Sequence, residues 1–208
     1  MIIDIGTGDG RAALAAAQAE PSALVVGLDA DAGAMSEVSR RAARPPRKGG
    51  RPNLLFAVAA AESPPAELHG LADEVRILFP WGSLLRGALG RDGAVAGGLA
   101  ALAKPGAQLV AVVSVTPTDR VPGVATLDRA ALDEVAARLR DAGFVLVEAG
   151  PMTADEVRAT HSTWGRRLLA GDSHRPVWRV RFGAQRPTAE LEEPARRRAT
   201  GAGVSSMD

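Results

Sequence analysis

The chain has 208 residues, of which 46% are hydrophobic and 24% charged, with no cysteine and a formal net charge of +1. This length allows one domain with a substantial core, and the composition is ordinary for a soluble globular protein. The lack of cysteine excludes disulfides and cysteine-ligated metals. The chain start lacks a signal-peptide pattern and no apolar run could span a bilayer, so we expect a cytoplasmic protein.

Short apolar runs alternate with amphipathic helical patterns, which is typical of βα units in a parallel sheet. The runs predict seven strands, over residues 2–5, 24–28, 54–59, 75–79, 109–115, 144–148 and 177–182. The helical patterns predict helices over residues 10–19, 32–43, 94–103, 127–141 and 154–169. We expect one α/β domain over residues 1–184, with a mostly parallel sheet flanked by helices, and a disordered polar tail over residues 185–208.

Basic residues are concentrated in two segments of this near-neutral chain. Six lie between Arg40 and Arg51 with no acid among them, and six arginines lie between Arg158 and Arg181 against the single acid Asp172. Such segments favour a local site for a polyanion, although two solvated surfaces would give the same pattern.

A glycine-rich turn joins the first strand to the first helix. Its glycines, Gly6, Gly8 and Gly10, follow the acid Asp4 with the spacing G-x-G-x-G, unlike the G-x-G-x-x-G of dinucleotide binders. The second strand ends at Asp29, 19 residues after Gly10, where a carboxylate can accept hydrogen bonds from ribose hydroxyls. Asp29 could instead cap the next helix.

The segment after the third strand supplies small residues beside an acid, Ala61 and Glu62. Small side chains suit a flat adenine pocket, so this segment and the glycine turn together predict a nucleoside-type cofactor site. The glycine spacing disfavours a nicotinamide cofactor. The histidines His69, His161 and His174 show no metal-ligand spacing, so we expect no metal.

Aromatic residues are scarce, with three tryptophans and no tyrosine. Trp81 follows the fourth strand, and Trp164 lies near the end of the last predicted helix. Two such rings could clamp a flat base from both faces, although each could also be a half-buried core residue. For Trp178, in the final strand, we expect a core position.

The motifs resemble those of the aminoglycoside-resistance 16S rRNA (adenine(1408)-N(1))-methyltransferases of the kanamycin–apramycin type. The matching stretches, in order over residues 1 to about 182, are Asp4-Ile5-Gly6-Thr7-Gly8-Asp9-Gly10-Arg11, Lys48-Gly49-Gly50, Ala59-Ala60-Ala61-Glu62-Ser63, Ile77-Leu78-Phe79-Pro80-Trp81-Gly82-Ser83-Leu84-Leu85 and Ser162-Thr163-Trp164-Gly165-Arg166-Arg167-Leu168. The pairing of Phe-Pro-Trp-Gly with the later Ser-x-Trp is the specific part.

The resemblance implies a Rossmann-like class I methyltransferase that uses S-adenosylmethionine and modifies 16S rRNA in the assembled 30S subunit. The residues implied to line or order the cofactor site are Gly6, Asp29, Ala61, Glu62, Leu78, Ser83 and Ser162. Trp81 and Trp164 are implied to stack on a flipped adenine. A backbone carbonyl near Pro80 is implied to accept a hydrogen bond from the amino group of that adenine. The residues implied to contact rRNA are Arg40, Arg41, Arg44, Lys48, Arg120, Arg167 and Arg175.

The implied reaction needs little from acid–base side chains. The N1 lone pair of neutral adenine is free at pH 7, so catalysis reduces to placing N1 in line with the methyl group. Extruding the base costs about a few kcal/mol, which phosphate contacts would offset. We expect a monomer that recognises the shape of the 30S subunit.

This sequence departs from the family at its start, because family members carry about a β-hairpin's length of chain before the first strand. Two alternatives remain open. The first keeps the enzyme class and changes the substrate. The chain could be a tRNA guanine-N7 methyltransferase, although the Asp-Pro-Trp normal after Phe-Pro in those enzymes is missing, or a small-molecule methyltransferase, although the basic segments would then have no purpose. It could also be a non-catalytic RNA- or cofactor-binding relative.

Overall fold

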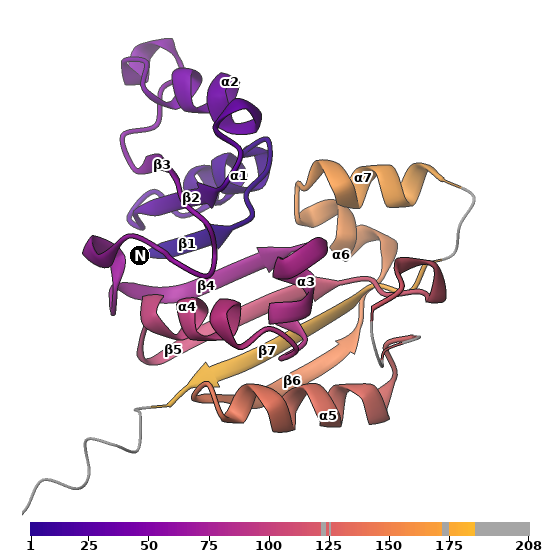
Figure 1. Ribbon diagram of the computed structural model, residues 1–208. Helices are drawn as coiled ribbons and strands as arrows, with labels where there is room; N and C mark the ends of the chain where they lie inside the picture. The colour runs from indigo at the N-terminus through magenta and orange to yellow at the C-terminus, as the bar shows by residue number, and fades with distance from the viewer. Residues whose placement is uncertain (122–123, 125, 172–174, 186–208) are drawn as a thin grey trace, which may run out of the picture.

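The structure, a computed structural model, describes residues 1–121, 124, 126–171 and 175–185. Within them the strands form a seven-stranded sheet in the order β3-β2-β1-β4-β5-β7-β6 (Figure 1). β7 runs antiparallel to β5 and β6, and the other pairs are parallel. The strands are β1 Ile2–Ile5, β2 Val25–Asp29, β3 Leu54–Val58, β4 Ala72–Leu78, β5 Ala103–Val113, β6 Phe144–Pro151 and β7 Trp178–Ala184. The predicted mostly parallel α/β sheet is confirmed.

Helices flank the sheet on both faces. The α-helices are α1 Arg11–Ala19, α2 Ala32–Ala42, α3 Gly82–Ala88, α4 Gly93–Leu102, α5 Arg129–Arg140, α6 Ala154–Ala159 and α7 Thr163–Ala170, and the 3-10 helices are η1 Pro46–Lys48, η2 Ala66–Leu68 and η3 Pro117–Asp119. The prediction of one helix over residues 154–169 is wrong, because His161 takes a left-handed φ of 56° between α6 and α7. Ser162 then caps α7.

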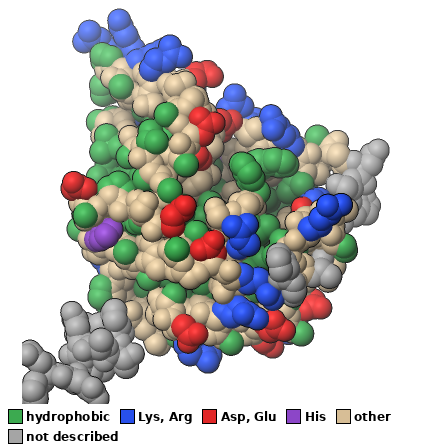
Figure 2. All heavy atoms as spheres, in the orientation of Figure 1, with side chains coloured by type: hydrophobic (Ala, Val, Ile, Leu, Met, Phe, Trp, Pro, Cys, Tyr) green, Lys and Arg blue, Asp and Glu red, His purple; other side chains and the backbone are tan. Residues whose placement is uncertain are grey.

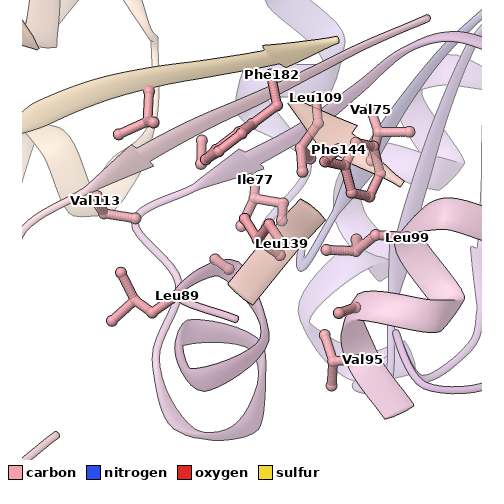
Figure 3. Close-up of a cluster of buried hydrophobic side chains, with 14 of the residues drawn as sticks. Val75, Ile77, Leu89, Val95, Leu99, Leu109, Val113, Leu139, Phe144 and Phe182 are labelled. Atoms are coloured by element: carbon pink, nitrogen blue, oxygen red, sulfur yellow. The ribbon is translucent and has the colours of Figure 1, made fainter. Parts of the chain in front are cut away.

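The core has two sides because side chains alternate along each strand. Ile3 belongs to the cluster that α3, α4 and α5 cover, and Ile2 to the cluster under α1 and α2. Figure 3 shows the first cluster, where Ile77 from β4 lies among side chains of α4 and α5 such as Leu99 and Leu139. α6 and α7 add a smaller cluster around Phe79.

The strand order reverses between β1 and β4. From β1 the chain moves outward through β2 and β3, and it then returns to β4 on the other side and continues to β5. The carboxyl ends of these parallel strands lie at one edge, where the crevice at the reversal is the usual ligand site of open α/β sheets. The fold therefore predicts where a cofactor binds.

Two expectations concern the chain beyond the sheet. The predicted disordered tail, residues 185–208, lies outside the described residues after Gln185. In the described part of the chain, no helix combines the length and apolar character that crossing a bilayer requires.

Phe144 and Val147 on β6 give a matched test of the core, since Phe144 is fully buried and Val147 is 67% exposed. Phe144→Ala is expected to lower the free energy of unfolding by about 3–5 kcal/mol, because it leaves a cavity in the packed core. Val147→Ala is expected to change it by less than about 0.5 kcal/mol. Urea denaturation of both variants checks this, and equal losses would contradict the packing described.

Candidate functional site

A cavity of about 500 Å³ lies at the carboxyl edge of the sheet, at the reversal of strand order. We call it the main cavity. Its walls are the loops after β1, β2, β3 and β4 and the start of α7. The predicted site residues on its lining are Asp4, Gly6, Gly8, Asp29, Ala61, Glu62, Leu78, Pro80, Trp81, Ser83, Ser162, Trp164 and Arg167. One cavity therefore collects residues from both the cofactor motif and the aromatic motifs.

The glycine loop bends through left-handed backbone at Gly6, Gly8 and Gly10, with φ values of 67°, 57° and 70°. The Gly6 amide donates to the Leu28 carbonyl at 2.8 Å, which fixes the loop to β2. A β-carbon on Gly8 would meet no atom within 4 Å, so bare backbone faces the cavity there. Gly10 does not line the cavity. It precedes α1, and its β-carbon would lie 2.7 Å from the Phe56 ring.

Asp29 is oriented by two backbone amides. Its Oδ2 accepts from Gly8 N at 2.8 Å, and its Oδ1 accepts from Asp31 N at 2.9 Å. The alternative of Asp29 as a helix cap is wrong, because Asp31 caps α2 through Gly33 N and Ala34 N. Each Asp29 oxygen keeps a second lone pair, so the carboxylate can still accept hydroxyl donors in the cavity.

Asp4 is a buried carboxylate at the cavity wall, 3% exposed. Its Oδ2 accepts from the Thr7 hydroxyl at 2.6 Å, whereas Oδ1 has no partner among the described residues. Burial raises the Asp4 pKa to about 6, against the opposing effects of the Thr7 hydrogen bond and the charge of Arg76. A buried, unpartnered acceptor beside a cavity favours a ligand that is cationic or donates hydrogen bonds.

Small residues close the side of the cavity after β3, where Ala59, Ala60 and Ala61 precede Glu62. Helix α4 supports this segment at Gly98, where a β-carbon would lie 1.9 Å from the Ala61 carbonyl oxygen. No local pattern in the sequence marks Gly98, because its role depends on a contact between distant segments.

The turn after β4 carries strained backbone. Phe79 has a φ of 51°, a conformation that costs about 1–3 kcal/mol for a bulky residue. The Phe79 amide donates to the Val112 carbonyl at 2.7 Å, and its buried ring lies under α7, where a β-carbon on Gly165 would be 3.0 Å away. This turn projects Trp81, which is 76% exposed.

The second tryptophan comes from α7. Trp164 is 50% exposed, and the Arg167 guanidinium carbon lies 5.9 Å from its ring centroid, within cation–π range. Trp178, in contrast, is partly buried against the main core, as expected. Trp81 and Trp164 therefore border the same cavity, and both keep aromatic surface exposed.

The first basic segment forms an exposed patch at the end of α2 and in η1, and Figure 2 shows its side chains at the top of the molecule. We call the α2 patch the four exposed residues of this segment that were predicted to contact rRNA, namely Arg40, Arg41, Arg44 and Lys48.

The two remaining basic predictions lie away from the α2 patch. Arg120 is exposed after η3. Arg175 is engaged within the protein, because its Nη2 donates to the Asp119 carboxylate at 2.5 Å and to the Ser114 carbonyl at 3.2 Å. The structure thus gives Arg175 a role in fixing η3, and its predicted contact with rRNA stays a prediction.

One long-range hydrogen bond joins the glycine loop to α7, and the sequence analysis missed it. The Thr163 hydroxyl donates to Asp9 Oδ2 at 2.6 Å. Both residues line the main cavity. The motifs Gly-Asp-Gly and Ser-Thr-Trp contain these residues, yet only the fold brings them together.

Comparisons with known proteins place the chain in one family. Residues 1–182 match the model of the family described as "NpmA: 16S rRNA (adenine(1408)-N(1))-methyltransferase". Proteins with that same enzyme name from Streptoalloteichus tenebrarius and Escherichia coli are 41% and 31% identical, each alignment covering 81% of this chain and 80% of the relative.

Solved structures give the same result. KamB, a 16S rRNA methyltransferase, has a TM-score of 0.82 at 36% identity, with 89% of this chain and 87% of that chain covered. A tryptophan-to-alanine mutant of the 16S rRNA (adenine(1408)-N(1))-methyltransferase from Catenulisporales acidiphilia, crystallised with cosubstrate SAM, has a TM-score of 0.80 at 35% identity, with 93% of this chain and 88% of that chain covered.

The Asp4 carboxyl gives a pH test of the cavity. S-adenosylmethionine carries a sulfonium charge, so its binding favours ionised Asp4, which is lost as the pH falls through about 6. Affinity is expected to be about tenfold lower at pH 5 than at pH 8, following the ionised fraction. Calorimetric titration checks this. Asp4→Asn should bind weakly with a flat pH profile, and an unchanged wild-type slope in that variant would contradict the assignment.

Proposed function

From the premise that the chain belongs to the family of 16S rRNA (adenine(1408)-N(1))-methyltransferases, we propose that it transfers the methyl group of S-adenosylmethionine to N1 of adenine 1408 in 16S rRNA. The observation that carries the proposal is the single cavity bordered by the glycine loop, Trp81 and Trp164. The added methyl and positive charge would weaken aminoglycoside binding to the ribosome.

The residues of the main cavity fit this cofactor. Asp29 offers free lone pairs to the ribose hydroxyls, and the small residues before Glu62 leave space for the adenine ring. The bare backbone at Gly8 and the unpartnered Asp4 Oδ1 accommodate the charged amino-acid part. When bound, the cofactor supplies an electrophilic methyl group.

The protein then has to position a nucleobase. Trp81 and Trp164 hold the flipped adenine by stacking, and a backbone carbonyl near Pro80 accepts a hydrogen bond from its amino group. No general base is needed because N1 carries a free lone pair. The indole faces stabilise the positive charge that develops on the purine during transfer. Catalysis by this site is therefore positioning and stacking.

Recognition of the substrate extends beyond the cavity. We propose that the α2 patch and Arg167 contact phosphates of 16S rRNA, with Arg120 and Arg175 farther along the surface. The matching partner is the assembled 30S subunit, whose shape presents phosphates at fixed positions. We propose that residues 1–184 form one methyltransferase domain and that the protein acts as a cytoplasmic monomer.

A transfer assay with radiolabelled S-adenosylmethionine tests the proposed function. Label is expected on N1 of adenine 1408 when purified 30S subunits are the substrate, with little on protein-free 16S rRNA or on bulk tRNA. Asp29→Ala is expected to lose transfer because the cofactor loses its ribose contact. Label on tRNA guanine N7 in place of 30S would support a different enzyme, and cofactor binding without any transfer would support a non-catalytic relative.

The α2 patch gives a second test. Replacing Arg41, Arg44 and Lys48 by alanine is expected to weaken 30S binding by about tenfold or more at 0.15 M salt and to reduce the salt slope by about 2–3, because three phosphate contacts are lost. The matched control replaces Arg129, Arg138 and Arg140 by alanine, which removes three exposed arginines from α5. Filter binding across a salt series measures both. An equal loss of 30S affinity in the control would mean that the overall positive charge of the protein, rather than the α2 patch, drives binding.

A further inference from the structure

The start of α7 is held at two points that face different parts of the site. Below it, Gly165 packs on the ring of Phe79, which belongs to the turn that projects Trp81. Beside it, the Thr163 hydroxyl donates to Asp9 Oδ2 at 2.6 Å, and Asp9 lies between Gly8 and Gly10 of the glycine loop. The hydrogen bond is partly buried, so it competes less with water than a surface contact does.

The other hydrogen bonds at this helix start are local to α6 and α7. Ser162 Oγ accepts from Gly165 N at 3.4 Å, and Thr160 Oγ1 accepts from Ser162 N at 3.2 Å. These bonds shape the helix start without touching the glycine loop. The Asp9–Thr163 bond is thus the side-chain hydrogen bond among the described residues that ties α7 to the loop.

The two partners sit within a short polar network. Arg11 Nε lies 3.4 Å from Asp9 Oδ2, and Arg166 Nη2 donates to the Thr163 hydroxyl at 3.0 Å. The Thr163 hydroxyl thus accepts a hydrogen bond from Arg166 and donates its own proton to Asp9. Trp164 is the next residue after Thr163, so a shift of Thr163 moves the attached indole.

We propose that Asp9 and Thr163 are positioning residues that couple occupation of the cofactor site to the placement of Trp164. The glycine loop holds the start of α7 in place through Asp9, and a cofactor that lies against the loop stabilises this arrangement. Trp164 is therefore held more firmly for the adenine when the methyl donor is bound. This inference rests on the proposed function for its purpose, although the coupling itself can be measured without transfer.

The test follows the tryptophan directly. In a background of Trp81→Phe and Trp178→Phe, Trp164 is the one remaining tryptophan of the chain and is excited selectively. Acrylamide quenching of its emission is measured with and without saturating S-adenosylhomocysteine. We expect the ligand to reduce quenching at least about twofold, because an indole held in place through the Asp9–Thr163 bond is less accessible to acrylamide. With Thr163→Val, which removes the hydroxyl and keeps the shape, we expect the ligand to leave quenching unchanged, and Thr163→Ser is expected to restore the response.

Calorimetry with the same ligand separates this role from a cofactor contact. It is measured on Thr163→Val made in the unaltered chain, which is expected to bind S-adenosylhomocysteine within about threefold of the unaltered chain. Transfer by this variant to 30S at saturating cofactor is expected to fall about tenfold, because one charge-assisted hydrogen bond is lost. The coupling would be overturned if the ligand protected Trp164 from acrylamide equally with and without Thr163→Val in the single-tryptophan background. It would also be overturned if Thr163→Ser failed to restore the response to the ligand. Failure of the unaltered chain to methylate 30S would overturn the proposed function alone.

Discussion

The site depends on the parallel direction of β1, β2, β3 and β4, which brings their carboxyl ends to one edge of the sheet. A glycine loop, an aspartate, an alanine segment and an aromatic turn follow these four strands in order, and each therefore opens into the same cavity. The reversal of strand order after β3 leaves the crevice there. The backbone alone creates this crevice. The side chains at the edge then need only be small, as in the alanine segment, acidic, as at Asp29, or flat, as at Trp81, to form a binding site.

Strain and close packing adapt that edge to a flat substrate. Phe79 takes a left-handed conformation before a proline, where extended backbone is preferred, and a hydrogen bond to β5 and burial under α7 hold it there. Gly165 allows α7 to approach that ring, and Gly98 allows α4 to approach the alanine segment. The stability of the core thus supports an aromatic surface at Trp81 that remains exposed for binding.

The sequence predicted all seven strands because they are apolar and bounded by turns, as at Ile2–Ile5. Its bounds were wrong at β5, which begins at Ala103 and was predicted to begin at residue 109. It also placed both tryptophans at the site through their motifs. It failed at His161, where a left-handed residue divides one predicted helix without a glycine or proline to mark it. The packing role of Gly10 against Phe56 and the bond between Asp9 and Thr163 depend on residues far apart in the chain, so local patterns carry no signal for them.

The central claim is that Trp81 and Trp164 act on one base, and a double-mutant cycle tests it most directly. The rate kcat/KM for methylation of 30S subunits is measured for Trp81→Ala, Trp164→Ala and the double variant, with cofactor affinity as the control. If the rings grip the same adenine, the double variant should lose at least about tenfold less than the product of the single losses. Losses that simply multiply, or a single variant that keeps full activity, would contradict a shared base between the two rings.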